Sequence, residues 1–134
     1  MPFFAVPDPG RLAPQPQGTT VLYREWPPVL GKGGREIQYI IKAYDGANRL
    51  KKRLAVRPRH LENMEKVPGK VICAGGLLDD RGNMKGSVLI MEFDSEELLR
   101  QYLDSEPYIR EQVWETVEVE PMNVVIVNGD KTGS

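Results

Sequence analysis

Hydrophobic residues gather in four stretches of the chain, and each stretch is predicted to form a β-strand. All four are rich in β-branched or aromatic side chains, which favour extended backbone; they are Glu36–Tyr44, Lys70–Leu78, Gly86–Phe93 and Trp114–Glu120. Residues 79–83 are turn-forming, so the second and third stretches are predicted to make a hairpin. The fourth stretch alternates between apolar and polar side chains, which is typical of a half-exposed strand. Residues 122–127 either extend it or form another edge strand.

Between the first two strands, apolar residues recur at helical spacing and predict a helix that opens at Ala47. Pro58 interrupts this helix, because a proline clashes with the preceding helical turn. We therefore expect a kink, or a new helix with Pro58 in its first turn and N–H groups left free to meet an anion. The apolar face of the helix would consist of Leu50, Leu54, Leu61 and Met64.

After the third strand, Ser95 is predicted to cap another helix, because its hydroxyl can accept a hydrogen bond from a free first-turn N–H. Glu96 and Glu97 favour the same start through the helix dipole. A short second helical piece is expected at residues 105–108. The inward face of the longer helix would consist of Leu98, Leu99, Tyr102 and Leu103.

These elements follow the order βαββαβ with an antiparallel hairpin in the middle, which predicts an α+β protein of the ferredoxin-like type. Both helices are expected to cover one face of the sheet. The other face also carries apolar side chains and needs a cover, most simply a second copy of the chain. We therefore predict a homodimer.

Residues 1–35 differ in composition from the predicted domain at residues 36–127. Seven of the 11 prolines lie in this stretch, so it is predicted to be an extended arm rather than a helix. Residues 19–23 could add a short edge strand. Two interpretations remain open: a disordered leader, or an arm that packs its aromatic residues on the domain or on a partner subunit. Residues 128–134 form a polar tail, and the aromatic residues of the arm are Phe3, Phe4, Tyr23 and Trp26.

Charge and cysteine content narrow the classes of function. A formal net charge of -1 argues against a protein whose main partner is nucleic acid. The single cysteine, Cys73, excludes an intrachain disulfide, provides no metal cluster and is expected to be buried in its strand. No apolar run approaches the roughly 20 residues of a membrane helix, and the N-terminus lacks a signal-peptide pattern. A cytoplasmic protein without a membrane partner or a metal is expected.

Candidate acid–base chemistry centres on His60, which is the only histidine in the chain. The histidine is either a general acid or base, or an ordinary helix residue that meets water or a backbone carbonyl. Arg53, Arg57 and Arg59 surround it in sequence. At least one of them is expected on a solvated face, paired with Glu62 or Glu65. Arg53 or Arg57 could instead bind a planar substrate anion.

The sequence around His60 resembles a known motif. Ala74-Gly75, Gly86-Ser87 and Pro107-Tyr108 follow it in the same order. The ordered residues of the motif are Asp45, Ala47, Leu50, Lys52, Arg53, Leu54, Val56, Arg57, Pro58, His60 and Leu61. Together these residues resemble the YciI-like (YCII-related domain) proteins over residues 36 to 127.

The resemblance implies a fold of the dimeric α/β-barrel kind and a pocket with a catalytic histidine and an acidic residue. Carried over by position, the histidine is His60, and the Asp-Pro-Tyr/Phe motif of the family appears as Glu106-Pro107-Tyr108. Glu106 retains the carboxylate with one more methylene, which places the charge differently. Asp45 matches a second carboxylate of the family.

Two functions are consistent with these residues. The first is a small enzyme of the lyase, isomerase or cyclase type that needs no cofactor. It would transfer protons through His60, with Glu106 or Asp45 as the carboxylate, on a small hydroxylated aromatic or oxo-acid compound. The second is a non-catalytic protein that binds a metabolite or recruits a partner. Candidate substrate-binding residues are Arg53, Arg57, Tyr39, Tyr44, Ser87 and Tyr108, although a tyrosine on the apolar pattern is more often a core residue.

Overall fold

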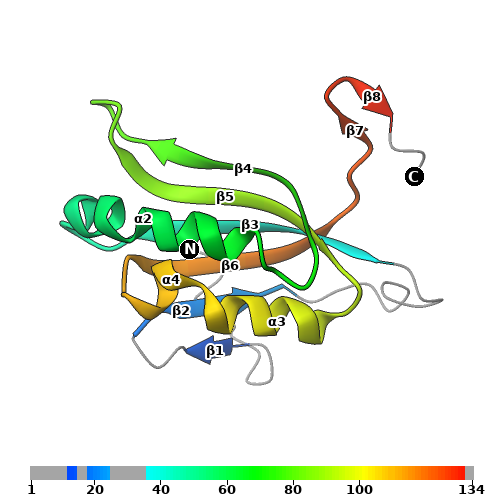
Figure 1. The fold of residues 1–134 in the computed structure, drawn as a ribbon, viewed down its shortest axis with the longest axis horizontal. Coiled ribbons are helices and arrows are strands. Elements are labelled where there is room, and N and C mark those ends of the chain that lie inside the picture. The colour runs from blue at the N-terminus through cyan, green and yellow to red at the C-terminus, as the bar shows by residue number, and fades with distance from the viewer. Residues whose placement is uncertain (1–11, 15–17, 25–35, 132–134) are drawn as a thin grey trace.

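A computed structural model of the protein describes residues 12–14, 18–24 and 36–131 (Figure 1). The aromatic residues Phe3, Phe4 and Trp26 of the predicted arm lie outside these ranges. The strands and helices, in chain order, are β1 Leu12–Pro14, β2 Thr20–Tyr23, β3 Ile37–Asp45, α2 Leu50–Met64, β4 Lys70–Leu78, β5 Met84–Phe93, α3 Glu96–Ser105, α4 Pro107–Arg110, β6 Trp114–Met122, β7 Ile126–Val127 and β8 Asp130–Lys131.

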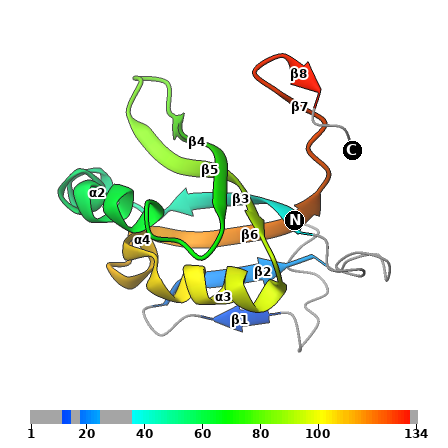
Figure 2. The same ribbon diagram turned by 45° about the vertical axis from the view of Figure 1, so that its right-hand side comes forward.

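Six of the strands form one sheet in the order β1-β2-β6-β3-β5-β4. The four strands of the βαββαβ unit pair antiparallel with their neighbours, with β3 between β5 and β6 and with β4 outside β5. This topology confirms the predicted α+β, ferredoxin-like fold. The helices α2, α3 and α4 lie on one face of the sheet, and the short β7–β8 hairpin stands away from it (Figures 1 and 2).

The hydrophobic core lies between the helices and one face of the sheet. Alternate residues of β3, namely Ile37, Tyr39, Ile41 and Ala43, are buried there, while those between them are partly exposed. This alternation is expected where helices cover one face of a sheet. Core residues from the helices are Val56, Leu99, Tyr102, Leu103, Tyr108 and Ile109.

The N-terminal strands change the position of β6 in the sheet. The predicted strand at residues 19–23 exists, but it pairs parallel with β6 and has β1 on its other side, so it is not the edge. Tyr23 at its end is buried, and the Arg100 guanidinium of α3 lies 4.1 Å from its ring centre. With neighbours on both sides, β6 buries Val117, Glu118 and Val119 in succession. The fourth strand is still half exposed, as predicted, because Glu115 is exposed and Glu120 partly exposed; only Glu118 departs from the predicted alternation.

The helix α2 presents a different face to the core than its leucines predicted. Leu54 and Leu61 are 54% and 44% exposed, whereas the buried residues of α2 are Arg53, Val56 and His60. Two polar residues can occupy the inward face because both find partners on neighbouring elements. The predicted apolar face was therefore wrong at these two leucines.

Pro58 lies inside one continuous helix. The helix begins at Leu50 rather than Ala47, after Asn48 in a left-handed conformation (φ 59°). A proline here removes only the N–H that would bond to the carbonyl of Leu54, and Leu54 is exposed to water. The alternative of a new helix, with free N–H groups beside His60, is therefore wrong.

The outer strand β4 is largely exposed, and this includes Cys73, which was expected to be buried. In the register of β4 with β5, Cys73 lies opposite Ile90 on the sheet face away from the helices. In the described part of the chain, no helix is long and apolar enough to span a membrane.

Candidate functional site

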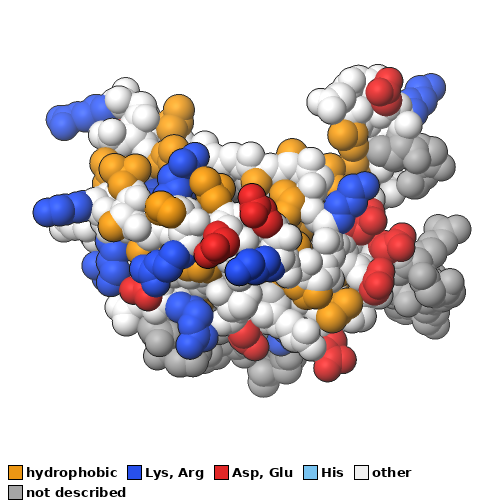
Figure 3. Space-filling model, in the orientation of Figure 1, with side chains coloured by type: hydrophobic (Ala, Val, Ile, Leu, Met, Phe, Trp, Pro, Cys, Tyr) orange, Lys and Arg blue, Asp and Glu red, His pale blue; other side chains and the backbone are white. Residues whose placement is uncertain are grey.

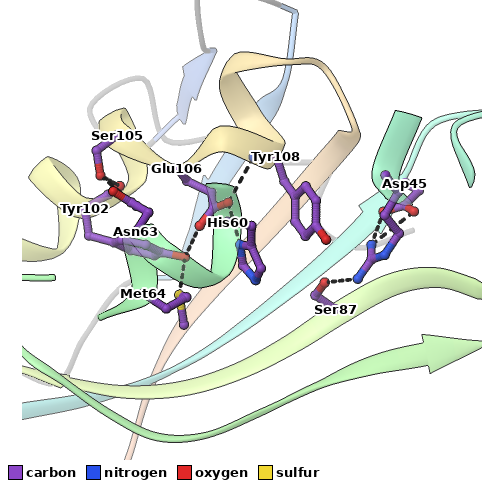
Figure 4. A network of polar contacts seen from close by, with 10 residues as sticks. Asp45, His60, Asn63, Met64, Ser87, Tyr102, Ser105, Glu106 and Tyr108 are labelled. Carbon is purple, nitrogen blue, oxygen red and sulfur yellow. Dashed lines mark hydrogen bonds and ion pairs between the residues drawn. The ribbon is translucent and has the colours of Figure 1, made fainter. Parts of the chain in front are cut away.

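The candidate site lies where α2 faces α4 and the sheet. Arg53 and His60 are seven residues apart, so they lie on the same side of α2 about two turns from each other. The Tyr108 ring of α4 stacks on the His60 ring at 4.2 Å with an interplanar angle of 18°, and the Arg53 guanidinium lies 4.7 Å from the same ring. Figure 4 shows Tyr108 between His60 on one side and Asp45 and Ser87 on the other.

Glu106 lies at the junction of α3 and α4, where it caps the end of α3 and the start of α4. Its N–H donates to the carbonyl of Leu103 at the end of α3, and its side chain accepts from the Tyr108 N–H at 2.9 Å at the start of α4. This capping role fixes the direction of the side chain. The residue is fully buried, with 0% exposure, and therefore needs a hydrogen-bond partner for each oxygen.

His60 and Glu106 are directly hydrogen-bonded, with 2.7 Å between Nδ1 and Oε2. The glutamate also accepts hydrogen bonds from the Tyr108 N–H and the Tyr102 hydroxyl, so its carboxyl group acts as an acceptor. His60 Nδ1 is then the donor, and in a neutral ring Nε2 carries a lone pair. Nε2 has no hydrogen-bond partner among the described residues, and His60 is 8% exposed.

Tyr102 completes this group, and the sequence predicted it only as a core residue. Its hydroxyl donates to Glu106 Oε1 at 2.5 Å. Burial, and then the charge and hydrogen bond of Glu106, raise the pKa of Tyr102 well above its usual value, so the phenol keeps its proton. The only signal in the sequence is the four-residue spacing to Glu106, which places both side chains on one side of a helix.

Asp45, Arg53 and Ser87 form a second polar group on the other side of Tyr108. Arg53 Nη1 donates to both carboxylate oxygens of Asp45 at 2.8 and 3.1 Å, and Nη2 donates to Ser87 Oγ at 2.7 Å. The Asp45 and Arg53 side chains are 6% and 3% exposed. Burial raises the pKa of Asp45, although the Arg53 charge and hydrogen bonds oppose the shift. Because both of its oxygens accept from Arg53, Asp45 is the partner of Arg53 and not of His60.

The other arginines of the motif are exposed. Arg59 Nη1 lies 3.3 Å from Glu111, a different partner from the expected Glu62 or Glu65. Arg57 is exposed one helical turn from both Arg53 and His60. Figure 3 shows Lys and Arg side chains gathered toward the end of the molecule where α2 lies.

The structure does not bring all predicted residues to the site. Tyr44 is 40% exposed on the opposite face of the sheet, and Tyr39 is fully buried in the core, where its ring lies 6.0 Å from that of Phe93. Trp114, which was predicted only as the start of a strand, meets the His60 ring edge-on at 6.0 Å. Within the described ranges, no three His, Cys, Asp or Glu residues are grouped as metal ligands.

Comparison with known proteins identifies relatives over most of the ferredoxin-like unit. The model of a family described as YCII-related domain matches residues 37–123. Protein YciI of Escherichia coli O6:H1 is 37% identical over 95 residues, which are 65% of this chain and 97% of YciI. Aspercryptin biosynthesis cluster protein B of Emericella nidulans is 32% identical over 87 residues, 58% of this chain and 56% of that protein.

A solved structure shares the fold. It is 5-chloro-2-hydroxyhydroquinone dehydrochlorinase from Burkholderia phenoliruptrix AC1100, in complex with 2,5-dihydroxybenzoquinone. The match has a TM-score of 0.58 and 24% sequence identity, and it covers 64% of this chain and 93% of the other. The match agrees with the ferredoxin-like βαββαβ sheet of this chain.

Proposed function

The chain belongs to the YCII-related domain family, and on that premise we propose that it is a small enzyme that uses no cofactor. The proposed reaction is a lyase, isomerase or cyclase reaction on a small hydroxylated aromatic or oxo-acid metabolite. His60 is the proposed general acid–base group, and Glu106 is the carboxylate that orients it.

The observation that carries this proposal is the 2.7 Å hydrogen bond between His60 Nδ1 and the fully buried Glu106. Two residues 46 positions apart are held together by a carboxylate that two further donors fix in place. A surface histidine would need none of these contacts. A histidine whose Nδ1 is bound to a carboxylate is a common arrangement for a general base.

The proton transfer follows from this geometry. Nε2 accepts a proton from a substrate hydroxyl or from an acidic C–H group, which leaves the substrate as a phenolate or enolate. The resulting imidazolium is stabilised by Glu106 through Nδ1–H. The same proton returns at another atom in an isomerisation, or the negative charge expels a leaving group in an elimination.

Arg57 is a better candidate than Arg53 for stabilising the negative charge that develops on the substrate. Both terminal nitrogens of Arg53 are already bonded to Asp45 and Ser87, so Arg53 serves to hold the Tyr108 ring in place. Arg57 is exposed and one turn away from His60, where a guanidinium suits a planar anion. The Tyr108 and Ser87 hydroxyls are further candidate donors to the substrate.

The test is a substrate panel of small oxo acids and polyhydroxylated aromatics, including 5-chloro-2-hydroxyhydroquinone, on which the structural relative is named to act. His60→Gln is expected to lower kcat by about 100- to 10,000-fold on any compound turned over. Glu106→Gln, which keeps the shape but removes the charge, is expected to act in the same direction. Arg59→Gln, next to His60 but exposed, is the matched control.

Undiminished turnover in His60→Gln would refute the assignment of His60. If calorimetry detects binding of a panel compound but the wild type turns none over, the protein is better described as the non-catalytic binding alternative.

We also propose that the protein works as a homodimer that covers the open face of its sheet. Ile40 lies opposite Ile90 in the middle of this face and Val88 lies near them; all three are partly exposed. Sedimentation velocity should give twice the 15.1 kDa chain mass for the wild type. Ile90→Lys should be monomeric, whereas Leu54→Lys on the outer surface of α2 should not. A monomeric wild type would contradict the proposal.

A further inference from the structure

Tyr102 is a buried tyrosine whose ring and hydroxyl are both held. Its ring is 0% exposed and stacks on Phe93 with 6.2 Å between the ring centres. Its backbone carbonyl accepts the hydroxyl of Ser105 at 2.7 Å. The hydroxyl is thereby aimed at the region between α2 and α3, where Figure 4 shows Met64 and Glu106 on either side of it.

The hydroxyl has one proton and two possible acceptors. Met64 Sδ lies 3.4 Å away and Glu106 Oε1 lies 2.5 Å away. A carboxylate oxygen is a far stronger acceptor than a thioether sulfur, so the proton is committed to Glu106. The other oxygen, Oε2, receives the Tyr108 N–H and His60 Nδ1. Tyr102 is therefore the only described residue that donates to Oε1.

We propose that Tyr102 is a positioning residue that keeps the Glu106 carboxylate in the form and orientation that accept the Nδ1 proton of His60. This inference rests on the proposed function of His60 and Glu106, and it adds a third residue to that pair. Tyr102 acts through Glu106, because no contact of its hydroxyl reaches the His60 ring.

The reason is the cost of an unsatisfied oxygen in a fully buried carboxylate. Without the hydroxyl, Oε1 has no donor among the described residues, and the carboxyl group gains by taking up a proton. A protonated carboxyl group can donate to Nδ1 instead of accepting from it. The ring proton of neutral His60 then moves to Nε2, and Nε2 can no longer accept a proton from a substrate.

The chemistry of Tyr102 suits a permanent donor. Burial and the neighbouring Glu106 raise the pKa of Tyr102 well above its usual value, so its hydroxyl carries a proton across the working pH range. A histidine or a lysine in this place would lose its proton within or near that range. The tyrosine keeps the arrangement of Glu106 and His60 independent of such a change.

The test is ¹⁵N NMR of the imidazole, which is unambiguous because His60 is the only histidine. In the wild type, at a pH where the ring is neutral, the proton is expected on Nδ1. In Tyr102→Phe, the population is expected to shift toward the Nε2–H form. Tyr44→Phe, on the opposite face of the sheet, is the control and should leave the spectrum unchanged.

A Tyr102→Phe spectrum identical to that of the wild type, in a protein with an unchanged thermal melt, would overturn the proposal. If Tyr102→Phe does not fold, site-specific replacement of Tyr102 by 4-fluorophenylalanine, which fills the space of the hydroxyl but has no O–H to donate, tests the same bond, and an unchanged imidazole spectrum there would also overturn the proposal. The measurement needs no substrate, so it reports the His60 tautomer even if the protein turns out not to be an enzyme. Where a substrate is known, Tyr102→Phe should lower kcat about 10- to 100-fold with an unchanged KM, the effect of losing one hydrogen bond to a charged group.

Discussion

Replacing Arg53 with methionine should destabilise the protein strongly, because Arg53 is one partner of a buried ion pair. Its guanidinium makes three hydrogen bonds, two to Asp45 and one to Ser87, and it is 3% exposed. Methionine keeps most of the apolar stem but removes every donor. Asp45 would then remain as a carboxyl group with 6% side-chain exposure and no cation beside it.

The size of the effect follows from this geometry. Removing one partner of a buried pair typically costs about 3–5 kcal/mol. Burial already raises the pKa of Asp45, so this group can take up a proton in the variant and recover part of the loss. We therefore expect the lower end, about 3 kcal/mol. With a urea m-value of about 2 kcal/mol/M, this loss lowers the unfolding midpoint by about 1.5 M.

The assay is urea unfolding followed by tryptophan fluorescence and circular dichroism at pH 7. Arg57→Met is the matched control, because Arg57 is exposed on the same helix and should change stability by less than about 0.5 kcal/mol. A double-mutant cycle with Asp45→Asn then isolates the pair, and its coupling energy should exceed about 2 kcal/mol. An Arg53→Met midpoint close to that of Arg57→Met, or a coupling energy near zero, would refute the reasoning.

Three further predictions concern other parts of the molecule. Val56 is 2% exposed, so Val56→Ala should lower the free energy of unfolding in urea by about 2 kcal/mol. Leu54→Ala should lower it by less than about 0.5 kcal/mol, and the reverse order would show that Leu54 faces the core after all. Burial raises the pKa of Glu118 above its usual 4.5, so the folded state binds this proton more tightly and loses stability as pH rises above about 4.5. The stability of Glu118→Gln relative to the wild type should therefore increase between pH 4 and pH 7. A difference between their urea midpoints that stays constant over this range would contradict the prediction. Cys73 should react with a thiol reagent in the native protein, and more slowly as the proposed dimer forms with rising concentration; full protection in dilute protein would contradict its exposure.

The order of the elements could be predicted from the sequence because it depends on local periodicity. The β-branched stretches became β3, β4, β5 and β6, and the turn at residues 79–83 joins a hairpin as expected. Ser95 caps α3, with its hydroxyl accepting from the Leu98 N–H at 3.3 Å. Spacing along one segment is enough to decide such features.

The same reasoning failed for α2, where periodicity and tertiary contacts disagree. The leucine spacing indicated one face, but the helix buries Arg53, Val56 and His60 instead. The partners that make this possible are Asp45, Ser87 and Glu106, which come from β3, β5 and the α3–α4 junction. No pattern within α2 contains information about these partners.

By itself, the sequence determined the strands and helices of the βαββαβ unit, their order and, through its motif, the positions of His60 and Glu106. Tertiary structure decided which atoms meet: the histidine with Glu106, the arginine with Asp45, and Tyr102 with the glutamate oxygen that no other described residue reaches. The physical reason is range. Helix and strand periodicity is a property of neighbouring residues, whereas a hydrogen bond across 46 positions depends on how the elements pack together.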